Sequence, residues 1–158
     1  MKKLILLFAA ALLCFAVGCG TAEIKKTEID DNSSIVIVPA SATLEINGDT
    51  TLEDYIAALK DAGKLTYEGN KSDYGLFITS MDGKENKVVS STANSSEGYS
   101  WTIYIDFLTL DGVIYAGDSE VCDYNGTTLY KASYGVSAIP CLEGHTYAFV
   151  YEYYNFTW

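Results

Sequence analysis

The residues best suited to catalysis gather in one short stretch near the C-terminus. Residues 134–147, YGVSAIPCLEGHTY, contain His145, the only histidine of the 158-residue chain, together with Cys141 and Pro140. A histidine can serve as general base for a serine or cysteine nucleophile. A triad is defined by geometry, however, and no Gly-x-Ser-x-Gly elbow accompanies His145. Because His145 directly follows Gly144, we interpret it as the polar start of a strand and expect no enzyme.

Other reactive groups are sparse as well. Two cysteines and one histidine are too few for a tetrahedral metal site. The runs DDNSS and DGKEN lack the spacing and the closing Glu of a calcium loop. Carboxylate pairs such as Glu53-Asp54 fit the positive end of a helix, and no phosphate-binding glycine loop occurs. We therefore predict neither a metal site nor a cofactor.

The N-terminus has the pattern of an export signal. Lys2 and Lys3 precede an apolar run from Leu4 to Val17, and small residues follow before Cys19. The run is too short to span a bilayer comfortably. The end FAVGC resembles a bacterial lipobox, which implies a signal peptide over residues 1–18 and a lipid on Cys19. The alternative is an ordinary secretory signal cut nearby. Both place the protein outside the cytoplasm, and the first anchors it to the cell membrane.

The charge of the chain excludes one class of partner. Lys+Arg number 10 against 21 Asp+Glu, which gives a net charge of −11, and removal of Lys2 and Lys3 would take it to −13. Such a surface repels phosphate backbones, so we expect no nucleic acid. All ten basic residues are lysine, so arginine clamps for phosphate or carboxylate are absent.

The remaining cysteines suggest a disulfide. Cys14 falls in the predicted signal and Cys19 carries the lipid, which leaves Cys122 and Cys141. In an oxidising compartment two leftover cysteines most simply pair. We predict a Cys122–Cys141 bridge, which would stabilise the fold by about 3 kcal/mol.

The elements that must position these residues can be expected from the pattern. Residues 19–34 are polar and predict a lipidated tether, followed by one domain over residues 35–158. TTLEDYIAALKDAGK predicts one helix, capped by Thr50 or Thr51 and ended by Gly63. Its buried face would carry Leu52, Tyr55, Ile56 and Leu59.

The rest of the domain is predicted to be strands. In YSWTIYIDFL, Trp101, Ile103, Ile105 and Phe107 alternate with Thr102, Tyr104 and Asp106, so one face is core and the other wetter. HTYAFVYEYY alternates in the same way, and Asp111-Gly112 and Asn125-Gly126 indicate hairpins. One helix among strands predicts an α+β domain.

Tyrosine is the most conspicuous residue type, with thirteen copies beside two tryptophans. Most should pack in the core or across strands, but tyrosine is also common in binding surfaces. Trp101 shares the apolar strand face and is more readily core than contact. Tyr104, on the wetter face, and Tyr134, beside a glycine, are better contact candidates.

The order of these motifs resembles a known domain. A capped helix leads to YGLFITSMDG, then to the Trp strand YSWTIYID, and then to YGVSAIPCLEGHTYAFVYEY. This order is similar to the domain at the C-terminal end of transcobalamin and intrinsic factor, and to its bacterial relatives in extracellular proteins. The similarity covers roughly residues 41–153. The motif positions are Thr79, Ser80, Gly83, Ser100, Trp101, Gly135, Val136, Ser137 and Gly144.

The resemblance implies a fold and a ligand. The fold would be β-grasp-like, a mixed sheet with one helix packed across it. In the vitamin carriers this domain closes over cobalamin, which by analogy places Trp101, Thr102, Gly135, Val136 and Ser137 near a ligand. To these we add Met81, Tyr104 and Tyr134 from their own positions. The carriers also contain a helical barrel, which this chain lacks, and residues 106–133 are longer than the family's connection.

The sequence thus predicts a lipid-anchored, extracytoplasmic binding protein whose ligand is a corrinoid such as cobalamin, working beside a membrane transporter. The alternative is an adhesion or assembly module that binds a protein or a cell-wall polymer. A pocket lined by Tyr104, Tyr134 and Gly135 would favour the small ligand, whereas a broad aromatic patch would favour the second function.

Overall fold

The computed structural model describes residues 24–30, 33–41 and 46–158. The predicted signal peptide and the lipidation site Cys19 lie outside these residues. One helix, α1 (Leu52–Asp61), accompanies the strands of the described part. The strands are β1 (Lys25–Asp30), β2 (Ser33–Pro39), β3 (Tyr67–Ser72), β4 (Gly75–Met81), β5 (Lys84–Glu85), β6 (Lys87–Ser91), β7 (Ser95–Ile105), β8 (Thr109–Leu110), β9 (Val113–Ile114), β10 (Ala116–Tyr124), β11 (Thr127–Ala132) and β12 (Thr146–Thr157).

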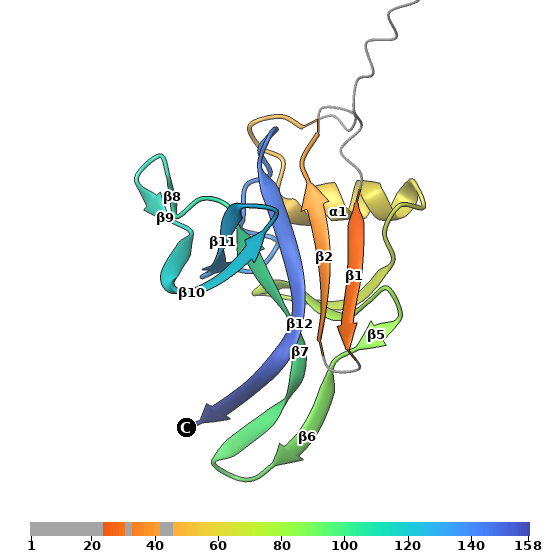
Figure 1. Cartoon of the computed structure of the whole chain (residues 1–158), viewed down its shortest axis with the longest axis vertical. Helices are drawn as coiled ribbons and strands as arrows, with labels where there is room; N and C mark the ends of the chain where they lie inside the picture. Colours follow the sequence, from red (N-terminus) through yellow and green to blue (C-terminus); the bar gives the residue numbers. More distant parts are fainter. Residues whose placement is uncertain (1–23, 31–32, 42–45) are drawn as a thin grey trace, which may run out of the picture.

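The domain is α+β, and sheet dominates it. The large sheet has the order β1-β2-β12-β7-β11-β10, and β6 also pairs with β7 (Figure 1). Every ladder of the described strands is antiparallel, so the mixed sheet predicted from the sequence is wrong for this part. The reason is the position of β12. It runs antiparallel to both β2 and β7 and lies between them, so these two strands never form a parallel pair.

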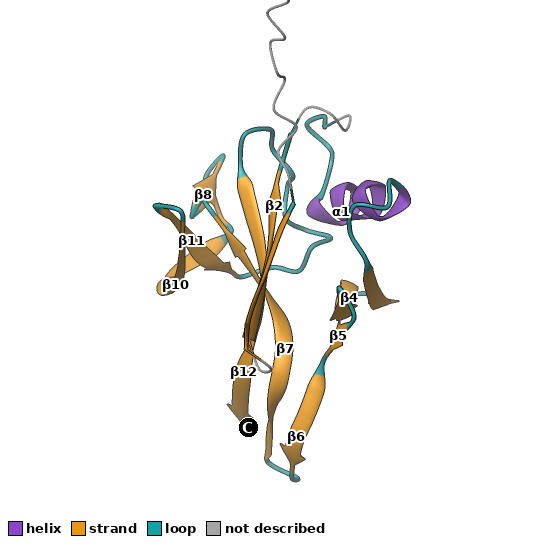
Figure 2. Ribbon diagram, turned by 45° about the vertical axis from the view of Figure 1, so that its right-hand side comes forward, coloured by secondary structure: helices purple, strands orange, loops and turns teal. Residues whose placement is uncertain are grey.

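Two hydrophobic clusters lie on the two faces of this sheet. Tyr147, Phe149 and Tyr151 of β12 belong to the larger cluster, which includes the buried face of α1. Ala148 belongs to the second cluster, and Val150 packs against it. Figure 2 shows the helix and the β3–β4–β5 sheet on one side of the central strands and the β10–β11 hairpin on the other. The predicted alternation of the last strand is therefore confirmed, but both of its faces are covered.

The helix forms where the sequence predicts it. Thr51 is the N-cap, and its hydroxyl accepts a hydrogen bond from the Asp54 amide at 3.2 Å. In return, the Asp54 carboxylate accepts from the Thr51 amide at 3.0 Å, which completes a capping box. Gly63 follows the helix with φ +67°, a conformation that favours glycine.

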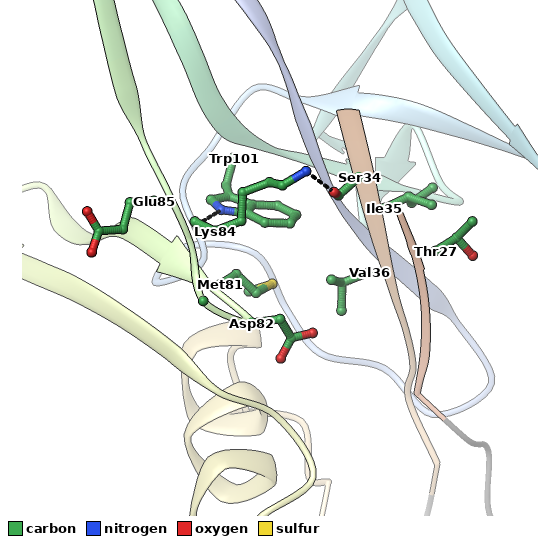
Figure 3. A pocket seen from close by; sticks show the side chains of 10 residues that line it. Thr27, Ser34, Ile35, Val36, Met81, Asp82, Lys84, Glu85 and Trp101 are labelled. Carbon is green, nitrogen blue, oxygen red and sulfur yellow. Dashed lines mark hydrogen bonds between the residues drawn. The ribbon is translucent and has the colours of Figure 1, made fainter. Parts of the chain in front are cut away.

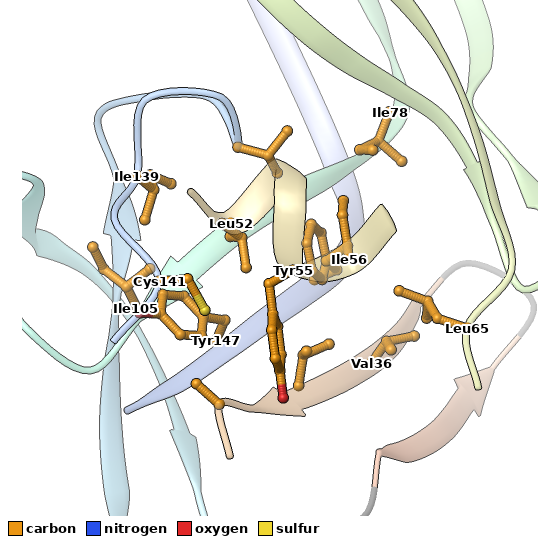
Figure 4. Packing of buried hydrophobic residues seen from close by; sticks show 14 of the residues in the cluster. Val36, Leu52, Tyr55, Ile56, Leu65, Ile78, Ile105, Ile139, Cys141 and Tyr147 are labelled. Atoms are coloured by element: carbon orange, nitrogen blue, oxygen red, sulfur yellow. The ribbon is translucent and has the colours of Figure 1, made fainter. Parts of the chain in front are cut away.

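The helix buries the predicted face. Leu52, Tyr55, Ile56 and Leu59 are all buried. Figure 4 shows Leu52, Tyr55 and Ile56 packed beside Tyr147. The Tyr55 hydroxyl donates to the Pro39 carbonyl at 3.0 Å, so this buried ring also finds a polar partner at the end of β2.

The predicted hairpin turns are present. Asp111 and Gly112 join β8 to β9, and Asn125 and Gly126 join β10 to β11. All four have positive φ, between 48° and 82°. Positive φ at both central residues is the geometry of a type I′ turn, for which Asn-Gly and Asp-Gly are preferred.

The N-terminal boundary differs from the prediction. Residues 25–30, assigned from their polarity to the tether over 19–34, form β1 and pair with β2 from Lys25↔Ile37 onward. Strand β2 itself begins at Ser33, before the expected domain start at residue 35. An edge strand can be polar because its stability comes from the backbone ladder and it remains open to water on one side.

Replacement of Thr51 by Ala removes the hydroxyl of the capping box. We expect the free energy of unfolding to fall by about 1 kcal/mol, the usual cost of losing an N-cap. Urea unfolding followed by circular dichroism would measure the change. Thr109→Ala, at an exposed position of β8, is the matched control and should change stability by less than about 0.5 kcal/mol. Equal effects of the two substitutions would contradict a capping role.

Candidate functional site

A cleft of about 640 Å³ opens between two separate parts of the chain. Thr27, Ser34 and Val36 line it from β1 and β2, whereas Met81, Asp82 and Lys84 line it from the β4–β5 hairpin. Trp101 of β7 lies between these walls. Figure 3 shows Val36, Met81 and Trp101 around the same space, while Glu85 points away from it. A volume of this size is typical of small-molecule sites.

Aromatic polar groups hold the hairpin wall in place. The indole N–H of Trp101 donates to the Lys84 carbonyl at 2.8 Å, and the Tyr151 hydroxyl donates to the Glu85 carbonyl at 2.8 Å. The Trp101 amide donates to the side chain of Asn86 at 3.2 Å. The hairpin is therefore tied to β7 and β12 at three points. Such a wall is largely formed before a ligand arrives, which reduces the ordering cost of binding.

Lys84 brings positive charge to the cleft. Its ammonium donates to the Ser34 hydroxyl at 2.6 Å, which links the two walls, and lies 5.2 Å from the centre of the Tyr151 ring. On the hairpin side, Asp82 accepts from the Thr66 hydroxyl at 3.0 Å. The cleft therefore combines an apolar aromatic floor with charged groups in its hairpin wall. This combination suits an amphipathic ligand that carries hydrogen-bond acceptors.

The aromatic floor continues beyond the cleft. Trp101 contacts the Tyr151 ring at 5.3 Å between centroids, Tyr151 stacks on Tyr99 at 5.9 Å, and Tyr99 meets Tyr153 at 5.5 Å. Tyr153 is half exposed. This row of rings follows one face of β7 and β12 from the buried floor to the surface.

Two predicted ligand residues, Met81 and Trp101, meet in this cleft. Two others lie on the opposite face of the sheet. Thr102 pairs with Val150, which packs against the second cluster. Tyr104 is only 4% exposed, so the expectation that it lies on a wetter strand face is wrong. Its hydroxyl donates to Glu152 at 2.9 Å, and burial raises the pKa of Tyr104.

The predicted segment 134–137 lies at the far end of the β4 strand. The Ser137 hydroxyl accepts a hydrogen bond from the Leu76 amide at 2.8 Å, near the start of β4. The β4 residue that lines the cleft is Met81, at the end of the strand. Leu76 and Met81 are separated by five residues of β4, or about 17 Å. Segment 134–137 is therefore not part of the cleft. Tyr104 belongs to the second cluster, whereas Tyr134 contacts Tyr115, which packs against the larger cluster, so the two tyrosines do not line one pocket together.

The segment instead ties the helix to its surroundings. Val136 is fully buried, and its carbonyl accepts from the Glu53 amide at 3.0 Å. The Ser137 hydroxyl donates to the Glu53 carboxylate, which also pairs with Lys71 at 2.7 Å. Gly135 is exposed, and Tyr134, 45% exposed, contacts the Tyr115 ring at 5.7 Å.

The predicted Cys122–Cys141 bridge is absent, and both cysteines are free. Cys141 is buried in the larger cluster, whereas Cys122 packs against the second. The two thiols thus belong to opposite faces of the sheet. Burial raises the pKa of Cys141 to about 12, and burial also raises that of Cys122. Both thiols are therefore poorly nucleophilic at neutral pH.

His145 has a structural partner that the sequence did not suggest. Its Nδ1 lies 2.7 Å from a carboxylate oxygen of Asp106, and the other oxygen accepts from the Thr146 amide at 2.8 Å. The His145 ring also meets the edge of Phe107 at 5.1 Å. These contacts fix the start of β12 against the end of β7, as expected for a residue that begins a strand.

Sequence reasoning missed Ser34, Val36 and Lys84 as cleft residues. Ser34 fell in the predicted tether, and Lys84 follows the Asp82-Gly83 turn, where a lysine is unremarkable. The available signal was that turn, whose positive φ at both residues forms the tight hairpin of β4 and β5.

Comparison with known proteins finds no matching family model, no matching curated protein and no matching solved structure. Among the described residues, no three His, Cys, Asp or Glu side chains are placed to share a metal ion. The described part of the chain also has no helix of the length and hydropathy needed to cross a membrane.

The contacts of Glu53 with Lys71 and Ser137 make the free energy of unfolding depend on pH. Hydrogen bonds from Lys71 and Ser137 lower the pKa of Glu53 below its ordinary value of 4.5. The unfolded chain binds this proton more tightly, so the stabilisation is present above about pH 5 and is lost as the pH falls through 4.5 and below. Glu53→Gln should therefore lower the free energy of unfolding by about 1 kcal/mol at pH 7.

This loss should shrink on acidification, because the parent chain also loses the ionised carboxylate. Urea titrations at neutral and at acid pH would measure the difference. Glu68→Gln is the control, since that carboxylate is exposed and lies 3.8 Å from Lys60. A penalty for Glu53→Gln that stays constant with pH would show that the carboxylate charge contributes nothing.

Proposed function

We propose that this protein captures a small amphipathic ligand in the cleft between the β1–β2 pair and the β4–β5 hairpin. One observation carries this proposal: Trp101 and Met81 form the floor of a cleft whose hairpin wall is fixed by three hydrogen bonds. Capture needs shape, apolar surface and a few placed polar groups, all of which the cleft supplies.

A corrinoid such as cobalamin is the ligand class we propose first. It is a flat macrocycle bordered by amide groups, so its face would lie on apolar surface and an amide oxygen would accept from Lys84 in place of Ser34. A volume of about 640 Å³ would enclose part of such a molecule. The exposed end of the aromatic row, at Tyr153, offers further surface beside the enclosed part.

The finer fold assignment belongs to the same proposal. We propose a β-grasp-like relative of the transcobalamin and intrinsic factor C-terminal domain that has an antiparallel sheet in place of the mixed one, on the strength of motif order and of one helix packed on a sheet face. In this version the ligand contacts shift from segment 134–137 to the β4–β5 hairpin. Segment 134–137 instead holds the start of the helix, through hydrogen bonds of Val136 and Ser137 with Glu53.

The place of action follows from the N-terminal pattern. We propose an extracytoplasmic lipoprotein anchored through Cys19, with a membrane transporter as the partner that receives the ligand. The ligand would be held and passed on without chemical change. The β1 strand follows the anchor within a few residues, and Thr27 of β1 lines the cleft. Anchor and site would therefore lie close together in the chain.

Adhesion to a protein or a cell-wall polymer is the second candidate. Exposed aromatic side chains at the C-terminal end favour it, because Phe156 and Trp158 are 60% and 68% exposed and are not among the residues that line the cleft. This surface does not require a small ligand, so the two functions are separable by experiment.

Titration of the chain from Gly20 with cyanocobalamin would test the first proposal, with calorimetry and the ligand's visible spectrum as readouts. We expect saturable binding. Lys84→Gln should weaken it about tenfold, since a hydrogen bond from a charged donor is lost. Tyr134→Ala is the matched control and should bind as the parent does.

If Tyr134→Ala weakened binding and Lys84→Gln did not, the ligand would be assigned to segment 134–137, as the family resemblance alone implies. That result would contradict binding in the cleft. If the titration gives no heat and no spectral change at millimolar ligand, capture of this corrinoid by the chain alone is excluded. Binding to purified cell wall in the same preparation would then favour adhesion.

A further inference from the structure

The asparagines of this chain stand in one short motif more often than chance allows. Asn-x-Ser/Thr, where x is not proline, is the acceptor motif for N-linked glycans on the surface of secreted proteins. The 158 residues include seven asparagines and a total of 27 serines and threonines, so chance would place about one asparagine in the motif. The motif holds five of the seven: Asn32, Asn70, Asn94, Asn125 and Asn155.

The two asparagines outside the motif are used by the fold. The side-chain oxygen of Asn47 accepts from the Asp49 amide at 3.0 Å. The side chain of Asn86 donates to the Ile78 carbonyl at 2.8 Å and accepts from the Trp101 amide at 3.2 Å. Both side chains therefore have a structural reason to be asparagine.

The asparagines within the motif differ in this respect. Asn32 lies outside the described residues, and Asn70, Asn94, Asn125 and Asn155 are all exposed. Within the described part of the chain, the side-chain amides of Asn70, Asn94 and Asn125 form no hydrogen bond. Their amide nitrogens are therefore open to solvent and are not needed for packing or for hydrogen bonding of neighbours.

Backbone geometry separates these four sites. Asn70 and Asn155 lie in the β3–β4 and β12–β7 ladders, so their backbones are engaged with a neighbouring strand. Asn94 lies in the bend between β6 and β7, and Asn125 lies in the turn between β10 and β11 with φ +48°. An enzyme that modifies the motif must bind these backbone residues in its own site, and a loop is more available for this than a paired strand. Asn94 and Asn125 are therefore the better acceptors.

The Asn94 site lies beside an exposed tryptophan. It belongs to the finger formed by β6, the start of β7 and the end of β12, which continues past the other strands (Figure 1). The Asn94 carbonyl accepts from the Trp158 amide at 3.0 Å, and the Ala93 carbonyl accepts from the Trp158 indole at 3.1 Å. The indole is held there although it is 68% exposed. A sugar on Asn94 would cover this apolar ring, and glycans make a surface more soluble.

Both sites leave the Trp101 cleft open. Asn125 lines a separate pocket of about 290 Å³ together with Ile37, which belongs to the second cluster. The cleft is lined by Val36, which belongs to the larger cluster on the other face of the sheet. Neither Asn94 nor Asn125 lines the cleft. Modification of these residues is therefore independent of the ligand bound there.

We propose that Asn94 and Asn125 are acceptor sites for N-linked glycans. The donor would be an oligosaccharide carried on a polyprenyl diphosphate. The asparagine amide nitrogen attacks the anomeric carbon of the sugar, the carbon–oxygen bond to the diphosphate breaks, and the lipid diphosphate leaves with the amide proton. This inference rests on the proposed export of the chain, because the motif is glycosylated in secreted proteins. It holds for either form of the N-terminal signal.

Mass spectrometry of the full chain, purified from the cells that make it, would test both sites. We expect the intact mass to exceed that of the processed chain by whole hexose and N-acetylhexosamine units. Fragmentation of the glycopeptides should place these units on Asn94 and Asn125.

Substitution of the hydroxyl residue tests the motif without touching the asparagine. Ser96→Ala and Thr127→Ala should each abolish the glycan on the asparagine two residues before, because each destroys one motif. Ser95→Ala and Thr128→Ala are the matched controls. They remove a neighbouring hydroxyl, keep both motifs and should leave both glycans in place.

The same spectra separate a failure of this proposal from a failure of export. A chain that carries a lipid on Cys19 and no sugar overturns glycosylation and leaves export in place. A chain that retains its signal peptide contradicts export and overturns glycosylation with it. Sugar that survives both Ser96→Ala and Thr127→Ala, or that is found only on Asn70 or Asn155, overturns the assignment to the two loop sites.

Discussion

The position of β12 is the constraint on which the rest of the structure depends. It pairs with β2 on one side and β7 on the other, so its backbone is paired along most of its length. Its side chains alternate between the larger cluster, through Tyr147 and Phe149, and the second cluster, through Ala148. A strand covered on both faces fixes its register strongly, because a shift of one residue would exchange the two sets of side chains. That register in turn sets where Tyr151 meets Trp101, and hence where the floor of the cleft lies.

Buried tyrosine side chains connect the helix and β12 to neighbouring loops and strand ends. The rings of Tyr55, Tyr147 and Tyr151 are buried, yet each hydroxyl donates to a backbone carbonyl of a loop or strand end, at Pro39, Pro140 and Glu85 respectively. Each ring thus contributes apolar area and one directed polar contact. The turn at Pro140 also receives the helix start, since the Leu52 amide donates to the Ile139 carbonyl at 2.8 Å. Residues 134–147, which hold the only histidine and one cysteine, therefore have a structural role and connect the helix to the last strand.

Local features of the fold were predictable, and non-local ones were not. The threonine cap, the buried helix face and the Asp-Gly and Asn-Gly hairpin turns follow from short-range chemistry, and each is present. Tyr104 was misassigned because its strand face becomes buried only when the distant β10–β11 hairpin places Leu129 over it. The cysteine bridge failed for a similar reason, since sequence alone does not show that Cys122 and Cys141 belong to opposite faces. The cleft lies between β1–β2 and the β4–β5 hairpin, which are far apart in the sequence, and only Met81 and Trp101 could be named in advance.

The central claim is that ligand binds at the Trp101 cleft, and nitrogen-15 NMR of the two indole N–H groups tests it most directly. The chain has only two tryptophans, and Trp158 donates its indole N–H to Ala93 on the finger, so it serves as an internal reference. On addition of cyanocobalamin the account predicts that the Trp101 indole signal and the amides of Val36 and Lys84 shift together, while Trp158 stays in place. Shifts confined to residues 134–137, or to Trp158 and its neighbours, would contradict it.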